Sequence, residues 1–167
     1  MEARILIADD NEVCRGALGE LIQCHDHWEV CGYAEDGLQA VAKAIELKPD
    51  IVILDLAMPR MDGLSAAREI GKALPLIPLV LYSLHGFDLL ELEAKKVGIR
   101  RVVLKPDNDG LFRAIEELLK DAPYDTDQEK QISATPSVGS LSITAPLTQS
   151  EATAVQTSDN DPATKAN

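Results

Sequence analysis

Four ionisable side chains stand where short apolar runs end, and their types suit the chemistry of phosphoryl transfer. Asp9 and Asp10 close the first run, Asp55 lies near the end of a second, and Lys105 follows a third. Adjacent carboxylates resist ionising together unless a cation lies between them. Magnesium is the natural cation, because it takes oxygen ligands and is usually held by one or two carboxylates together with a phosphate. A carboxylate at such a site can itself be the nucleophile, since aspartyl phosphate is a recognised covalent intermediate.

A hydroxyl and an ammonium group complete this set of side chains. Lys105 would offer a point positive charge to the phosphoryl oxygens, and Ser83, at the end of a fourth apolar run, would offer a hydroxyl. Magnesium would shield Asp55 from the incoming negative charge. Each residue taken singly has an ordinary structural explanation, such as a solvated turn, a helix cap or an exposed lysine. These explanations together require four coincidences at the ends of four runs, so the sequence favours a phosphoryl site.

The side chains converge only if the apolar runs are parallel strands of one sheet, because the carboxyl ends of such strands share an edge. The runs are short, continuous and rich in Ile, Val and Leu, as expected for parallel strands that are covered on both faces. Five strands are predicted, over residues 4–8, 28–34, 50–55, 78–83 and 101–104.

Amphipathic stretches between these runs predict the helices that would cover the sheet. Asn11 and Asp36 are suitable N-caps for the first two, and Pro49 would stop the second. Three more helices are expected over 64–70, 87–97 and 111–119. Strict alternation of strand and helix predicts an α/β fold with a doubly wound parallel sheet, right-handed crossovers and helices on both faces.

Composition narrows the classes of partner. The chain of 167 residues has a formal net charge of -12. Arg100 and Arg101 form its largest basic cluster, which argues against a nucleic-acid surface, since phosphate backbones recruit clustered Lys and Arg. No apolar run is long enough to span a membrane, and the first apolar run meets Asp9 too early for a signal peptide.

The cysteines indicate a reducing compartment. There are three, an odd number that fits free thiols better than a disulfide framework, so a cytoplasmic location is expected. Cys24, His25, His27 and Cys31 form an alternative zinc site on paper. Their spacing matches none of the standard zinc patterns, and Cys31 falls in a predicted strand, where it would point into a core.

The composition changes after Lys120. Residues 1–120 are predicted to form one folded domain, and residues 121–167 a disordered acidic tail rich in Ser, Thr, Ala and Pro. Such a tail cannot bury enough apolar surface to offset the entropy lost on ordering. Weak β or helical preferences around 138–143 and 152–156 leave open that parts of it order against a partner.

The motifs together resemble the receiver domains of response regulators in two-component signalling, over about residues 3–120. They are ILIADDNE with Asp9 and Asp10, DIVILDLAMPRMDG with Asp55, LVLYSLHG with Ser83, and VVLKP with Lys105. The resemblance implies a flavodoxin-like fold with strand order 2-1-3-4-5. It also suggests that the peptide bond between Lys105 and Pro106 is cis.

The resemblance further assigns a role to each site residue. Asp55 would be the phosphoacceptor, phosphorylated by a sensor histidine kinase or a phosphotransfer protein. Asp10, Asp55 and the backbone carbonyl of Ala57 would hold Mg²⁺, with Asp9 assisting through water. Ser83 and Lys105 would bind the phosphoryl group.

The sequence departs from the family pattern at three positions. Val102 stands where receivers usually carry the Tyr or Phe that swings inward on activation, and Leu84 stands where Ala or Gly usually leaves room for the phosphoryl group. We therefore expect narrowed access to the site and a smaller or rerouted rearrangement. Ser83 in place of Thr keeps the hydroxyl and is a minor change.

Three functions from different classes follow. The first is a stand-alone receiver, a signalling protein and not an enzyme, that acts through an unidentified downstream protein or in a phosphorelay. The second is a receiver-like interaction module with impaired phosphorylation or switching. The third is a magnesium-dependent phosphohydrolase, for which His85 is the nearest acid or base. An FMN-binding flavodoxin is disfavoured, because the loop after the first strand is acidic. Homodimer formation stays open.

Overall fold

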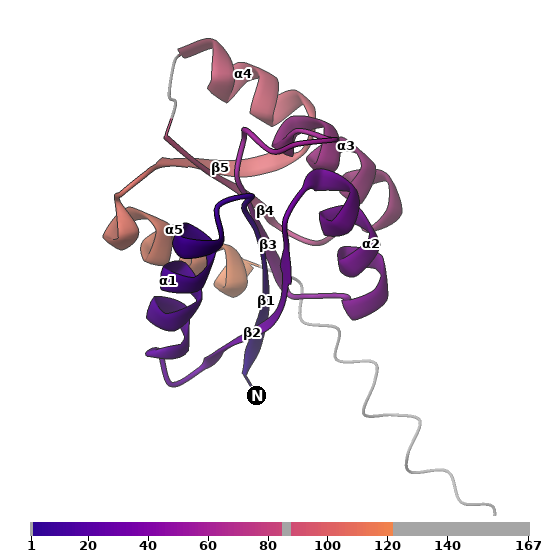
Figure 1. Ribbon diagram of the computed structural model, residues 1–167. Coiled ribbons are helices and arrows are strands. Elements are labelled where there is room, and N and C mark those ends of the chain that lie inside the picture. The colour runs from indigo at the N-terminus through magenta and orange to yellow at the C-terminus, as the bar shows by residue number, and fades with distance from the viewer. Residues whose placement is uncertain (1, 85–87, 122–167) are drawn as a thin grey trace, which may run out of the picture. The chain divides into compact units, whose positions relative to one another are not determined.

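Strands and helices alternate along the whole of the described chain (Figure 1). The computed structural model describes residues 2–84 and 88–121. The elements within these ranges are β1 (Ala3–Ala8), α1 (Glu12–Gln23), β2 (Trp28–Ala34), α2 (Gly37–Leu47), β3 (Ile51–Leu54), α3 (Gly63–Ala73), β4 (Leu79–Ser83), α4 (Asp88–Lys96), β5 (Ile99–Leu104) and α5 (Asn108–Asp121). Of the predicted tail, residues 121–167, all but Asp121 lie outside these ranges, as does His85, and Asp121 is the last residue of α5.

The strands form one parallel sheet in the order β2-β1-β3-β4-β5. This order confirms the predicted flavodoxin-like arrangement. β2 and β5 are its edge strands, and each carries an irregularity. Ile5 pairs with Val30 but Leu6 pairs with Gly32, which leaves Cys31 out of the register of β2. Arg100 is left out of the register of β5 in the same way. We call these two irregularities the edge bulges.

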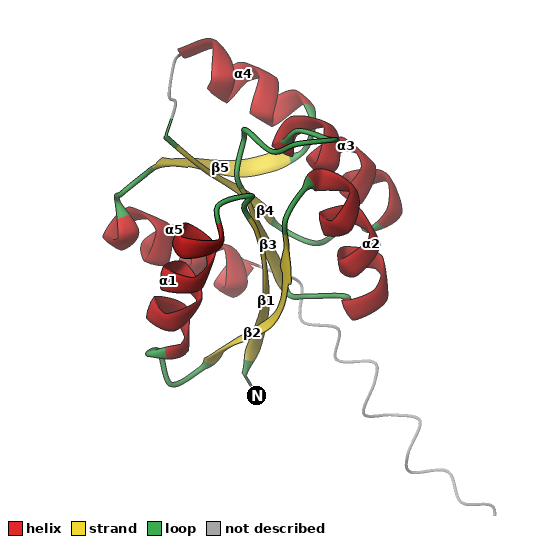
Figure 2. Cartoon of the chain, viewed as in Figure 1, coloured by secondary structure: helices red, strands yellow, loops and turns green. Residues whose placement is uncertain are grey.

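Helices cover both faces of the sheet, as the sequence predicts (Figure 2). Because side chains alternate along a strand, each strand contributes to both cores. Leu6 and Leu54 pack with residues of α2, α3 and α4 on one face. Ile7 and Ile53 pack with residues of α1 and α5 on the other. The central strands β1, β3 and β4 therefore read as continuous apolar runs.

The helix starts are fixed by side-chain caps. Asn11 accepts a hydrogen bond from the Cys14 amide and Asp36 accepts one from the Gln39 amide, which confirms both predicted caps. Asp62 caps α3 by accepting from the Ser65 amide at 2.7 Å, a role the sequence analysis did not assign.

One strand boundary was wrong by two residues. β5 begins at Ile99 and not at Arg101. Ile99 is almost fully buried and pairs with Leu79, while the two arginines that follow it are exposed. A single apolar residue ahead of two charges does not read as a strand, and the pairing with β4 settles the boundary. No helix in the part of the chain that the structure describes is long and apolar enough to cross a membrane.

Candidate functional site

Three strands bring the predicted site residues to one edge of the sheet. Asp9 directly follows β1, Asp55 directly follows β3, and Ser83 is the last residue of β4. All three are buried, with exposed fractions of 4%, 7% and 1%. Buried carboxylates need compensating partners, because a lone buried charge is costly. Lys105, directly after β5, is the partner of both carboxylates, Asp9 and Asp55.

The Lys105 ammonium bridges the two buried carboxylates. Its Nζ lies 2.6 Å from Oδ2 of Asp9 and 2.6 Å from Oδ1 of Asp55. Burial alone would lower the pKa of Lys105, but the hydrogen bonds with Asp55 and Asp9 outweigh burial and raise this pKa above its usual value. The side chain is therefore a fixed positive charge at neutral pH. The positions of Asp9, Asp55 and Lys105 at the ends of apolar runs predicted that these three would converge.

The loop after β3 fixes the second oxygen of Asp55. Oδ2 accepts a hydrogen bond from the Ala57 amide at 2.7 Å. α3 begins against the same loop, because the Gly63 amide donates to the Leu56 carbonyl at 3.0 Å. A Cβ on Gly63 would lie 2.1 Å from the carbonyl oxygen of Asp55, far inside contact distance. Glycine is therefore required where α3 passes the phosphoacceptor candidate.

Asp9 is held from three directions. Its Oδ1 accepts from the Asn11 amide at 2.8 Å, and its carbonyl accepts from the Arg15 guanidinium at 2.6 Å. Its Oδ2 contacts Lys105. Asp10 is exposed, and its side chain forms no hydrogen bond or ion pair with Asp9, Asp55 or Lys105. The structure therefore joins Asp9 and Asp55 through Lys105 and leaves Asp10 at the rim.

The oxygen donors at the site suit a hard cation, although the side chains are not grouped closely around one position. Across residues 2–84 and 88–121, no three His, Cys, Asp or Glu side chains are grouped closely enough to hold a metal ion. The available donors are the carboxylate oxygens of Asp9, Asp10 and Asp55, together with backbone carbonyls. These are the oxygen ligands that Mg²⁺ uses, usually with several waters. The chemistry of the donors fits Mg²⁺.

The alternative zinc site does not form in the described part of the chain, because structural zinc needs four side-chain ligands and no three are grouped there. Cys24 is exposed, and His25 stacks on Trp28 with ring centroids 4.1 Å apart. Cys31 is half-buried, and its thiol donates weakly to the Ile5 carbonyl at 3.4 Å. Burial raises the pKa of the Cys31 thiol, which keeps it protonated. All three cysteines are free, as predicted.

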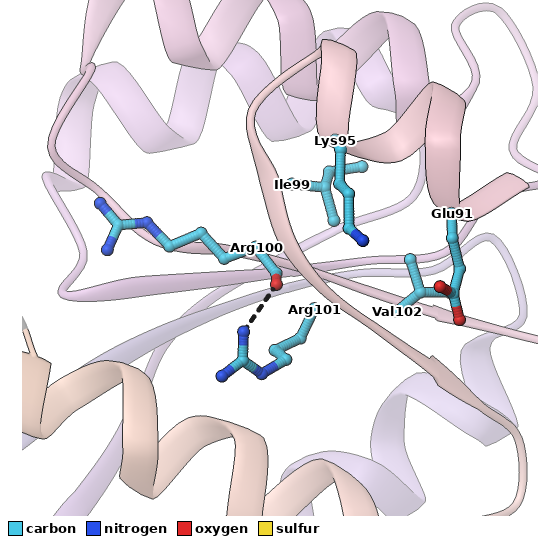
Figure 3. A pocket seen from close by; sticks show the side chains of 6 residues that line it. All are labelled: Glu91, Lys95, Ile99, Arg100, Arg101 and Val102. Carbon is cyan, nitrogen blue, oxygen red and sulfur yellow. Dashed lines mark hydrogen bonds between the residues drawn. The ribbon is translucent and has the colours of Figure 1, made fainter.

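The two atypical positions lie in different surroundings. Leu84 is 71% exposed, so it presents most of its side chain to solvent directly after Ser83. Val102 packs against the core on the α4 side of the sheet and lines a surface cavity of about 200 Å³ between α4 and β5. Figure 3 shows Glu91 and Lys95 reaching from α4 toward β5 above this cavity.

Two further contacts of the site edge escaped the sequence analysis. Buried Asp36 forms an ion pair with Arg60, whose φ of 64° is in the left-handed region. The Tyr82 hydroxyl donates to Oδ1 of Asn108 at 2.7 Å. Neither pair has a local sequence signal, because 24 and 26 positions separate their members and long-range pairs need the fold. The peptide bond between Lys105 and Pro106 is cis, as the resemblance suggested.

Comparisons with known proteins agree with this geometry. Residues 5–116 match the response regulator receiver domain family. The chain is 38% identical over 120 residues to the chemotaxis protein CheY of Thermotoga maritima, covering 72% of this chain and 98% of that protein. It is also 38% identical over 117 residues to a protein-glutamate methylesterase/protein-glutamine glutaminase of Anaeromyxobacter dehalogenans, a match that covers 70% of this chain and only 33% of the relative. The response regulator domain of T. maritima CheB superposes with a TM-score of 0.69 at 30% identity, covering 74% of this chain and 100% of that one.

Proposed function

Because the chain belongs to the response regulator receiver domain family, we propose that it accepts a phosphoryl group on Asp55 and signals by the resulting change in its surface. Receiver domains are signalling modules, not enzymes with a separate substrate. The observation that carries the proposal is the bridge from Lys105 to Asp55 and Asp9, since it places a fixed cation beside a buried carboxylate at the sheet edge.

Magnesium belongs to this proposal as the cofactor. Receiver domains generally bind Mg²⁺ at their acidic phosphorylation site, and the oxygen donors here suit that ion. We propose that Asp10, Asp55 and the carbonyl of Ala57 hold it, with Asp9 assisting through water. When bound, Mg²⁺ neutralises charge on the transferring phosphoryl group. Asp10 is exposed at the rim, so it is free to turn toward an ion that arrives from solvent.

The reaction transfers an anionic phosphoryl group to an anionic carboxylate. Residues of the chain must therefore compensate the negative charge that gathers in the transition state. An Asp55 carboxylate oxygen forms a bond to phosphorus while the bond from phosphorus to the donor breaks, and the donor leaves with its electron pair. Lys105 balances the charge of the phosphoryl oxygens. The Ala57 amide keeps the other Asp55 oxygen in place. Ser83 lies at the end of the neighbouring strand, from which its hydroxyl can approach a phosphoryl oxygen.

The phosphoryl donor and the readout are proteins in this proposal. A sensor histidine kinase or a phosphotransfer protein would deliver the group, and an unidentified protein would bind the phosphorylated form. The proposal includes a cytoplasmic location, which the three free cysteines support. It also includes the stand-alone arrangement, which the mass of the protein purified from its native source would test.

A receiver-like interaction module that no longer takes phosphate is the second candidate. The exposed Leu84 beside Ser83 and the missing aromatic at Val102 are the observations that favour it. The two candidates differ in a single measurable property, the formation of an acyl phosphate on Asp55.

Incubation with acetyl phosphate and Mg²⁺, followed by intact-protein mass spectrometry, tests the proposal. We expect a mass gain of one phosphoryl group in the wild-type protein and none in Asp55→Asn. Asp62→Asn is a matched control, because Asn also caps helices well and Asp62 lies in the loop that follows β3. It should be phosphorylated like the wild type. If neither acetyl phosphate nor a cognate kinase produces a mass gain, the interaction module is the better description.

A further inference from the structure

Tyr82, a buried residue directly before Ser83, contacts both the phosphoacceptor site and helix α5. Tyr82 precedes Ser83 in β4 and is only 6% exposed. Because neighbouring strand residues point to opposite faces, its ring lies in the core on the α1 and α5 side. Val102 packs on the other side of the sheet, toward α4. Tyr82 is therefore an aromatic residue beside the phosphoacceptor site. It lies on the face of the sheet opposite to Val102.

The ring of Tyr82 contacts the cation of the phosphoacceptor site. Nζ of Lys105 lies 5.6 Å from the ring centroid, within the range of a cation–π interaction. The same ammonium bridges Asp9 and Asp55. A change in the charge on Asp55 therefore alters what Lys105 contacts, and the Tyr82 ring lies beside that change.

The hydroxyl of Tyr82 contacts the first residue of α5. It donates to Oδ1 of Asn108 at 2.7 Å. Burial raises the pKa of Tyr82 above its usual value, although Lys105 acts in the opposite direction, so the hydroxyl keeps its proton and stays a donor at neutral pH. Asn108 begins α5 directly after the loop that carries Lys105 and Pro106. Lys105 and α5 are thus joined through a single side chain.

One turn further along, α5 reaches the only tryptophan of the chain. Phe112 lies four residues after Asn108, on the same face of the helix. Its ring centroid is 5.8 Å from that of Trp28 and 4.7 Å from that of His25. The sequence contains one Trp, so tryptophan emission reports on the surroundings of Trp28 alone. A displacement of α5 would change the surroundings of Trp28.

We propose that Tyr82 is a positioning residue that ties Lys105 to α5, so that phosphorylation of Asp55 is read out through α5 on the face opposite to Val102. This inference rests on the proposed phosphorylation of Asp55 and adds the path by which the resulting change reaches α5. Phosphorylation adds about -1.5 to -2 of charge and strong acceptors beside Lys105. When the ammonium turns toward the phosphoryl oxygens, its contact with the ring changes, and the hydrogen bond with Asn108 carries the displacement to the start of α5.

The test compares two single variants that break the same hydrogen bond from either end. Tyr82→Phe keeps the ring over Lys105 and loses the donor, and Asn108→Ala loses the acceptor. Each full-length variant is treated with acetyl phosphate and Mg²⁺. The change in tryptophan emission is divided by the phosphorylated fraction, measured by mass in the same sample. Tyr33→Phe is the matched control, since Tyr33 is 37% exposed in β2, at the end of the sheet away from β5, and its ring lies beside Gly19 of α1.

We expect the emission change per phosphorylated molecule to fall about fivefold in Tyr82→Phe and in Asn108→Ala, as expected when one neutral hydrogen bond no longer biases a two-state element. The double variant should fall no further than either single one. Tyr33→Phe should respond like the wild type. Asn108→Ala alone decides the matter if Tyr82→Phe does not fold.

Three results are distinguishable. Phosphorylation of the wild type without a change in Trp28 emission would overturn the inference and leave the proposed function intact. A response in both variants within twofold of the wild type would do the same. Absence of any mass gain on the wild type would contradict the proposed function itself and remove the inference with it.

Discussion

The ammonium group of Lys105 lies 2.6 Å from the carboxylate of Asp9, so the chain itself provides a cation for its buried acids. Asp55 receives the same ammonium at the same distance. Only 12% of the Lys105 side chain is exposed. Removing one partner of a buried ionic cluster leaves the others uncompensated, which costs more than the loss of an exposed ion pair.

Replacement of Lys105 by Met should therefore destabilise the fold and make its stability depend on magnesium. We expect the free energy of unfolding at neutral pH to fall by on the order of 3 kcal/mol, because Asp9 and Asp55 lose their shared cation. Mg²⁺ should recover part of this loss. Urea denaturation with and without Mg²⁺ measures both effects. Lys120→Met, at an exposed position, should change little, and an equal loss in the two variants would contradict the argument.

The stability of the wild type should decline at alkaline pH for a reason that is specific to Lys105. Its folded pKa lies above the ordinary value of 10.5, so its contribution is fully present below 10.5 and is lost as the pH rises through the higher folded value. Lys105→Met should flatten that part of the profile of unfolding free energy against pH. A profile of unchanged slope would mean that other groups, such as Tyr82, control the decline.

Two glycine-to-alanine substitutions should act in opposite directions. Gly63→Ala places a methyl group against the Asp55 carbonyl and should cost about 1–3 kcal/mol as well as slow phosphorylation. Gly16→Ala, inside α1 with no atom within 4 Å of the added Cβ, should stabilise by about 0.5–1 kcal/mol. Thermal unfolding and the rate of mass gain with acetyl phosphate measure the pair. Normal phosphorylation in Gly63→Ala would show that the loop after β3 tolerates displacement.

An aromatic side chain should fit at the position of Val102. The neighbouring cavity of about 200 Å³ between α4 and β5 offers space, so Val102→Phe should change the unfolding free energy by less than about 1.5 kcal/mol. Val80→Phe, in a fully buried position of β4, should overpack the core and cost about 1–3 kcal/mol. Chemical denaturation compares the two. Similar losses in both would mean that the cavity does not admit a ring.

The three thiols should differ in reactivity. Cys14 and Cys24 are exposed, whereas Cys31 is half-buried with a pKa raised by burial. Since the thiolate is the reactive form, an alkylating reagent at neutral pH should label Cys14 and Cys24 first and Cys31 only slowly. Mass spectrometry of timed samples measures the order. Rapid labelling of all three sites in folded protein would contradict the burial of Cys31.

The sheet and the cluster at the carboxyl ends of its strands were predictable because both depend on local patterns. The apolar runs predict buried parallel strands. Because Asp9, Asp55 and Lys105 follow the ends of these strands, the parallel arrangement brings them together. Contacts between distant positions were not predictable. The hydrogen bond from Tyr82 to Asn108 and the ion pair of Asp36 with Arg60 depend on how loops and helix starts meet after folding. Their residue types fit many other roles in a sequence.

The edge bulges bear on how the protein behaves in a crowded solution. An open edge strand can recruit strands from other copies, and interrupted, charged edges resist such growth. Both edges of this sheet are interrupted, at Cys31 on one side and at Arg100 on the other, where Arg101 adds a second charge. Neither edge strand should therefore pair readily with a strand of another copy, even at high concentration and with no cap over the edge.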